Sequence, residues 1–134
     1  MSPPTSAWPP MSESLNMAEI NIFKHARDTV ALQPGEVLFR EGEPGDVMFA
    51  VVEGRIELTR GGTVIEDVGP GGIIGELALI DSAPRSASAT ARASARVASV
   101  DHKYFTYLVQ EHPTFALQVM TVMAARLRKA NEHA

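Results

Sequence analysis

The sequence predicts a mainly β domain, a sandwich or a barrel, with helices at its flanks. Between Asp28 and Val100, short runs of β-favouring residues are broken every few positions by Gly or Pro. Short strands at regular spacing with turn residues between them are typical of sandwiches and barrels. After Val100, apolar residues recur every three or four positions, which is the period of an amphipathic helix. A chain of 134 residues is long enough for one such domain with a real core.

The expected strands are the β-favouring runs themselves. The run Val47–Val52 is almost wholly apolar, so we expect it to be a central strand. Gly61-Gly62 separates two runs and predicts a hairpin turn. The seven runs are Thr29–Leu32, Val37–Arg40, Val47–Val52, Arg55–Arg60, Val64–Val68, Ser86–Ala93 and Arg96–Val100.

The N-terminal residues divide into a tail and a short helix. Residues 1–16 contain four Pro among Ser and Thr, which predicts a disordered tail. The tail does not resemble a signal peptide, because no basic residue precedes Lys24 and it has no apolar core. Asn16 is a suitable N-cap for a helix over Met17–Ala26, so we expect the domain to occupy 17–134.

Two helices are expected at the C-terminal end. Asp101 is a suitable N-cap for a helix that ends at Glu111, and Pro113 favours the first turn of a second helix that runs to about Asn131. The second helix carries two neighbouring apolar stripes. Either both stripes make one broad core contact, or one of them packs on a second copy of the chain. The stripes are Ala116, Met120, Met123, Leu127 and Ala130, and beside them Phe115, Val119 and Val122.

The stretch Gly69–Ala91 contains the residues with the clearest binding chemistry. Gly75 precedes Glu76 and a short apolar run, and Arg85 follows a turn-forming segment. The guanidinium fork of Arg85 suits a phosphate, whereas the Glu76 carboxylate suits hydroxyl donors such as those of a ribose. This pair favours a nucleotide with little negative charge. The alternative is an exposed Glu and Arg beside a turn.

Several other classes of site lack the residues that they need. No Lys follows the glycines as a phosphate-binding P-loop requires, and the chain has no Cys. The four His have no metal-ligand spacing, and no nucleophile elbow occurs. We interpret the acidic residues Glu41, Glu43 and Asp46 as a solvated turn. The net charge of −4 disfavours a nucleic-acid surface, and no apolar run of about 18 residues is present to span a membrane. We therefore expect neither an enzyme nor a metal site.

Two segments resemble the cyclic nucleotide-binding domain family. Gly75-Glu76-Leu77-Ala78-Leu79 with Pro84-Arg85-Ser86-Ala87 is similar to its phosphate-binding cassette. The segments 34–46 and 51–55 are similar to its N-terminal β-roll, and the resemblance covers about 28–132. It implies an eight-stranded jelly-roll β-barrel with a short N-terminal helix, a short cassette helix and two C-terminal helices.

The resemblance also implies roles for individual residues. Glu76 would hold the ribose 2′-hydroxyl, and Arg85 would hold the cyclic phosphate. Backbone N–H groups of the cassette would add hydrogen bonds, small residues after Arg85 would leave room for the phosphate, and apolar residues would face the sugar and base. Asn131, late in the last helix, would lie near the base. The expected ligand-binding residues are Gly75, Glu76, Leu77, Ala78, Arg85, Ser86, Ala87, Ile65, Val68, Ile74 and Asn131.

The expected function is a non-enzymatic, cytoplasmic bacterial regulator that binds cyclic AMP, or as second choice cyclic GMP, and needs no other cofactor. Signalling would pass through the C-terminal helices to a protein effector, with a homodimer possible through the last helix, and neither nucleic acid nor membrane is an expected partner. Because no helix-turn-helix follows the last helix, we expect a stand-alone sensor domain or a fragment of a larger regulator. The alternative is a ligand-free interaction domain of the same fold that acts through its C-terminal helix.

Overall fold

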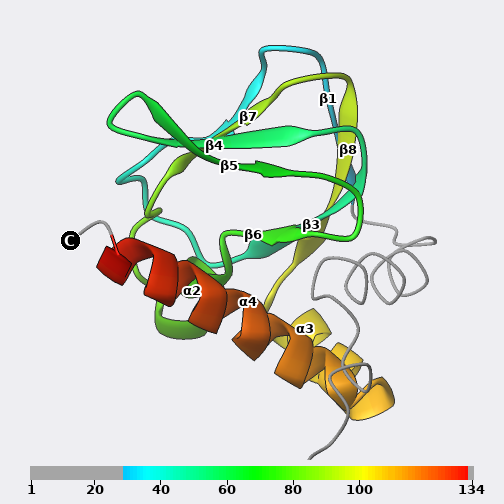
Figure 1. Ribbon diagram of the computed structural model, residues 1–134. Coiled ribbons are helices and arrows are strands. Elements are labelled where there is room, and N and C mark those ends of the chain that lie inside the picture. The colour runs from blue at the N-terminus through cyan, green and yellow to red at the C-terminus, as the bar shows by residue number, and fades with distance from the viewer. Residues whose placement is uncertain (1–28, 133–134) are drawn as a thin grey trace, which may run out of the picture.

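The computed structural model describes residues 29–132, in which two antiparallel sheets lie face to face and helices cover one side (Figure 1). The expected tail (1–16) and first helix (17–26) lie outside the described residues. The elements are β1 (Thr29–Leu32), β2 (Val37–Phe39), β3 (Met48–Glu53), β4 (Ile56–Arg60), β5 (Thr63–Val68), β6 (Ile73–Ile74), α2 (Glu76–Asp81), β7 (Ser88–Ala91), β8 (Ala95–Val100), α3 (His102–Glu111) and α4 (Thr114–Glu132).

Each sheet has four strands, in the orders β1-β8-β3-β6 and β2-β7-β4-β5. This arrangement confirms the mainly β fold with eight strands and C-terminal helices. The closed barrel is not confirmed, because no strand pairing joins the two sheets within residues 29–132, which therefore form a sandwich. The hairpin at Gly61-Gly62 is confirmed: Arg60 pairs with Thr63, and both glycines have the positive φ that a type I′ turn requires.

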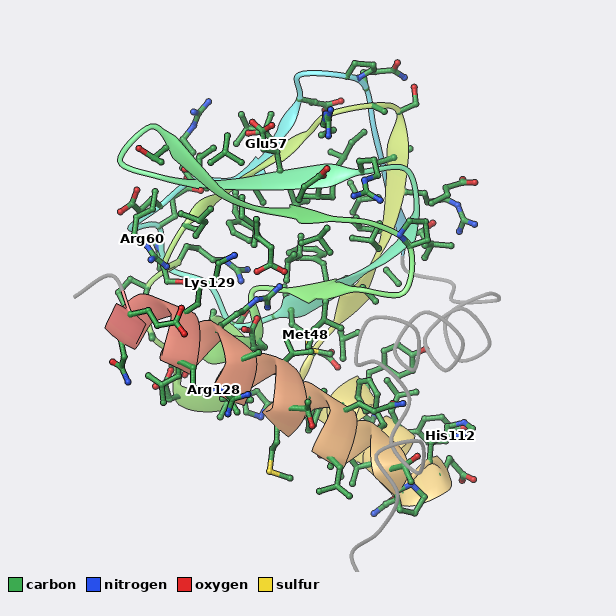
Figure 2. The ribbon with its side chains drawn as sticks, viewed as in Figure 1. Met48, Glu57, Arg60, His112, Arg128 and Lys129 are labelled. Carbon is green, nitrogen blue, oxygen red and sulfur yellow. The ribbon has the colours of Figure 1, made fainter. Side chains whose placement is uncertain are left out.

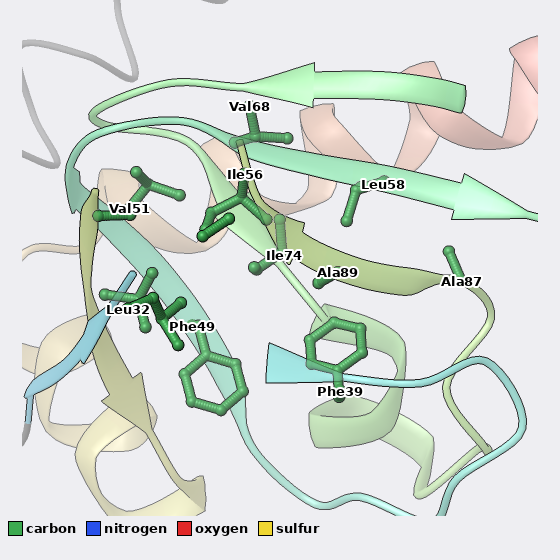
Figure 3. Close-up of a cluster of buried hydrophobic side chains, with 13 residues drawn as sticks. Leu32, Phe39, Phe49, Val51, Ile56, Leu58, Val68, Ile74, Ala87 and Ala89 are labelled. Carbon is green, nitrogen blue, oxygen red and sulfur yellow. The ribbon is translucent and has the colours of Figure 1, made fainter. Parts of the chain in front are cut away.

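Strand β3 is central, as its apolar sequence predicts, because both of its faces are buried. On one face, Phe49 and Val51 join a core between the two sheets (Figure 3). On the other face, Met48 and Ala50 pack with α3 and α4 in a second core. Alternating side chains of one strand thus supply two separate cores.

The C-terminal helices begin and pack largely as predicted. The Asp101 carboxylate accepts a hydrogen bond from the Tyr104 N–H at 2.8 Å, which confirms the expected N-cap of α3. On α4, only one of the two apolar stripes is buried, namely Phe115, Val119 and Val122. Leu117, Met120 and Leu127 are more than half exposed, so α4 does not make a single broad core contact. No helix within residues 29–132 combines the length and apolarity needed to cross a bilayer.

Candidate ligand-binding site

A cavity of about 830 Å³ lies between β4, β5, α2 and α4. Its volume is within the range of small-molecule sites. It is lined by Phe39, Leu58, Arg60, Thr63, Val64, Ile65, Glu66, Gly75, Glu76, Leu77, Ala78, Arg85, Ser86, Ala87, Met123, Ala124, Arg126, Leu127, Lys129 and Ala130. Segments from the two halves of the sequence therefore share one site.

The structure brings most of the expected site residues to this cavity. Those that line it are Ile65, Gly75, Glu76, Leu77, Ala78, Arg85, Ser86 and Ala87.

Three expected residues do not line the cavity. Val68 and Ile74 are buried in the core between the sheets, where Val68 is paired with Ile56 and Ile74 with Phe49 (Figure 3). Asn131 is exposed at the end of α4, whereas its neighbour Ala130 lines the cavity.

Arg85 is a buried cation without an acidic partner. The residue is only 6% exposed, and no carboxylate in residues 29–132 lies within ion-pair distance. Nη1 donates to Val47 O at 2.8 Å and to Gly75 O at 3.3 Å, while Nε and Nη2 have no acceptor in the described part of the chain. Cζ lies 4.3 Å from the centre of the Phe39 ring, a cation–π contact.

Electrostatics make this position suitable for an anion. Burial lowers the pKa of Arg85 below its ordinary value, and the charges of Asp46 and Glu43 only partly oppose that shift. A bound phosphate would supply the missing counter-charge and accept hydrogen bonds from the unused N–H groups of Nε and Nη2.

Glu76 is held in the site by a residue that sequence reasoning did not assign to it. Gly75 has φ 75°, a left-handed conformation that suits Gly, and Glu76 then begins α2. Glu76 is 5% exposed, and its Oε1 accepts from Arg126 Nη1 at 2.8 Å. The second oxygen, Oε2, has no partner among residues 29–132 and is available to a hydroxyl donor.

Arg126 joins four elements of the fold. Its Nε and Nη2 donate to Glu66 Oε1 and Oε2, both at 3.0 Å, and Nη2 also donates to Ile73 O at 2.8 Å. Burial disfavours the charged guanidinium, but the bonds and charges of Glu66 and Glu76 outweigh burial and raise the pKa of Arg126. Arg126 thus ties α4 to β5, β6 and α2.

One sequence signal points to Arg126. It continues the buried stripe Val119, Val122 at the spacing of four, where a helix surface faces the domain rather than solvent. Glu66 lies in a strand between partly buried neighbours and has no comparable signal.

The remaining lining of the cavity is largely apolar, with two further cations. Arg60 Nε donates to Ser86 O at 2.9 Å, and Lys129 Nζ lies 3.4 Å from Ile65 O. Figure 2 shows Lys129 on the side of α4 that faces the strands. Within residues 29–132 no group of three or more His, Cys, Asp or Glu is arranged to hold a metal ion. The site therefore offers an anion position, a hydroxyl acceptor and an apolar wall.

Comparison with known proteins agrees with this chemistry. The family model "Cyclic nucleotide-binding domain" matches residues 29–112. The chain is 31% identical over 115 residues to the CRP-like cAMP-activated global transcriptional regulator of Mycobacterium tuberculosis, a match that covers 78% of this chain and 51% of the relative. It is 35% identical over 107 residues to the cyclic nucleotide-gated potassium channel mll3241 of Mesorhizobium japonicum, covering 80% of this chain and 30% of the channel.

A solved structure extends the similarity to the C-terminal helices. The catabolite activator protein of Thermus thermophilus superposes with a TM-score of 0.73 at 25% identity, covering 93% of this chain and 61% of that protein. The chain spans about half the length of the Mycobacterium tuberculosis regulator.

Proposed function

The chain belongs to the cyclic nucleotide-binding domain family, and from that membership we propose that it binds cyclic AMP in the cavity beside α4, with cyclic GMP as the second candidate. The observation that carries the proposal is Arg85, a buried guanidinium with no carboxylate partner in residues 29–132 and with unused N–H donors on Nε and Nη2. A cyclic phosphate carries one negative charge and so matches one unpaired cation.

The proposed binding mode assigns each part of the ligand to a part of the cavity. Arg85 binds the phosphate, and Ser86 and Ala87 leave room beside it. Glu76 accepts a hydrogen bond from the ribose 2′-hydroxyl through its free oxygen. The purine lies along the apolar wall that includes Ile65 and the last turns of α4. The names of the relatives, one cAMP-activated and one cyclic nucleotide-gated, support a cyclic nucleotide as the ligand.

The test is calorimetry on protein that has been freed of ligand by unfolding and refolding. We expect cyclic AMP to bind in the micromolar range, about −8 kcal/mol, and cyclic GMP to bind more weakly. The control ligand is 5′-AMP, which has the same base and ribose but an open, more highly charged phosphate. Failure of both cyclic nucleotides to bind at millimolar concentration would contradict the proposal and leave a ligand-free interaction domain as the function.

Replacing Glu76 by Gln should weaken cyclic AMP binding more than binding of 2′-deoxy cyclic AMP. A hydrogen bond to a charged acceptor contributes about 1.5–3 kcal/mol, so the expected loss for cyclic AMP is roughly 10- to 150-fold. The deoxy ligand has no 2′-hydroxyl to donate, and it also controls for any effect of the lost Arg126 pair on the protein itself. Equal losses for both ligands, measured by calorimetry, would show that Glu76 only shapes the site.

We also propose that α4 pairs with α4 of a second copy and carries the signal toward an effector. Leu117 and Met120 are 54% and 53% exposed, three residues apart on one side of the helix. This exposed apolar pair supports a contact with a second chain, because contiguous exposed apolar surface marks sites of protein interaction. Light scattering should give the mass of two chains for the wild type and of one chain for the double variant Leu117→Gln/Met120→Gln. Ile80→Gln, at an exposed apolar position of α2, is the matched control and should stay dimeric. A monomeric wild type would overturn this proposal.

A further inference from the structure

The loop between β2 and β3 is hydrogen-bonded to Arg85, although its Pro44-Gly45 pair predicts only a turn. The Arg85 N–H donates to Glu43 O, and the Gly42 N–H donates to Arg85 O, both at 2.8 Å. Beyond Gly45, Val47 O accepts from Arg85 Nη1, also at 2.8 Å. The backbone on both sides of Gly45 is therefore held against Arg85.

At Gly45 any side chain would strike the Arg85 guanidinium. A Cβ atom built there would lie 2.5 Å from Nε, 2.6 Å from Cζ and 2.7 Å from Nη2. These separations are far below the 3.5–4.0 Å at which non-bonded heavy atoms attract each other. Gly45 is not among the glycines with positive φ, so its backbone conformation suits other residues as well. The position therefore requires Gly because there is no room for a side chain, and not because of its backbone conformation.

The guanidinium also contacts a rigid aromatic ring. The Phe39 ring lies 4.3 Å from Cζ and is itself packed in the core between the sheets. Gly75 also borders the guanidinium, because a Cβ atom there would lie 2.5 Å from Nη1. Gly45, Gly75 and Phe39 thus form a slot around the planar group.

We propose that Gly45 is a positioning residue for ligand binding, because its missing side chain lets the Arg85 guanidinium lie over the Phe39 ring with Nε and Nη2 unused. This inference rests on the proposed function for its effect on affinity, but the slot is a property of the free protein. In Gly45→Ala the fastened loop and the buried ring cannot retreat, so the flexible end of Arg85 leaves the slot. The cation remains present but misplaced for a phosphate.

The experiment compares Gly45→Ala with Gly35→Ala and the wild type, using cyclic AMP as the probe. Gly35 has φ 85°, and a Cβ atom added to it would meet nothing within 4 Å, so Ala there strains a turn without touching Arg85. Affinity is measured by calorimetry. The Arg85 Nε–Hε resonance of the free protein reports whether the guanidinium still lies over the Phe39 ring.

Gly45→Ala should move the Arg85 resonance and weaken cyclic AMP binding by about 10- to 100-fold, the loss expected when a hydrogen bond between charged groups is not made. Gly35→Ala should lower the melting temperature and leave both the resonance and the affinity unchanged. An unmoved resonance, or a moved one with unchanged affinity, would overturn the inference while the proposed function stands. If the wild type bound no cyclic nucleotide, the proposed function would fail, and the resonance alone would decide whether the slot exists.

Discussion

Arg85→Ala is expected to weaken cyclic AMP binding by about 30-fold to several thousand-fold while the domain stays folded. Removing one member of a desolvated, hydrogen-bonded charge pair costs about 2–5 kcal/mol. In the free protein Arg85 has no acidic partner within residues 29–132, so its removal leaves no carboxylate buried and unpaired. Calorimetry gives the affinity, and thermal unfolding shows that the fold survives.

Two companion variants sharpen this result. Arg85→Lys keeps the charge but not the planar fork, so it should also bind substantially more weakly than the wild type. Arg92→Ala is the matched control, because Arg92 is exposed, pairs with Asp67 and does not line the cavity. We expect wild-type affinity for that control. An affinity of Arg85→Ala within threefold of the wild type would show that the phosphate binds elsewhere.

The parts of the fold that were predictable are those encoded by neighbouring residues. Turn glycines, the apolar run of β3 and the Asp101 cap each act within a few positions, so they could be read directly from the sequence. Gly75, Glu76 and Arg85 belong to one short segment, and a single backbone path brings them together. Strand β6 was not predicted, because its two residues are too few to give a strand pattern of their own.

The parts that were missed depend on contacts between distant segments. Arg126 is 60 positions from Glu66 and 50 from Glu76, and nothing local marks the three as one cluster. Val68 and Ile74 are apolar residues near the cassette, and only strand pairing decides that they enter the core instead of the cavity. Gly45 is a turn residue by sequence, and its contact with Arg85 appears only when β2, β3 and the cassette meet.

Arg126→Met should destabilise the free protein by about 3 kcal/mol, or roughly 12–24 °C in melting temperature. The substitution keeps an apolar stem of similar length but removes every bond that Arg126 makes to Glu66, Glu76 and Ile73 O. Glu76 is then a buried carboxylate with no cation beside it, which is the costly half of a broken ion pair. Removing one partner of a buried ion pair costs about 3–5 kcal/mol. We take the low end of this range because the Glu66 side chain is 35% exposed, so solvent partly screens its charge.

The control for this loss of stability is a substitution two residues further along α4. Arg128 is exposed, and Figure 2 shows it on the side of α4 that faces away from the strands, so Arg128→Met should change stability by less than about 0.5 kcal/mol. Adding Glu66→Gln and Glu76→Gln to Arg126→Met removes the stranded charges and should recover part of the stability, because neutral replacements of a buried ion pair are often tolerated. Thermal unfolding of the four proteins measures each step. If Arg126→Met melted within about 2 °C of the wild type, α4 would be held by its buried apolar stripe alone, and the ion pairs would not couple the cavity to the helix.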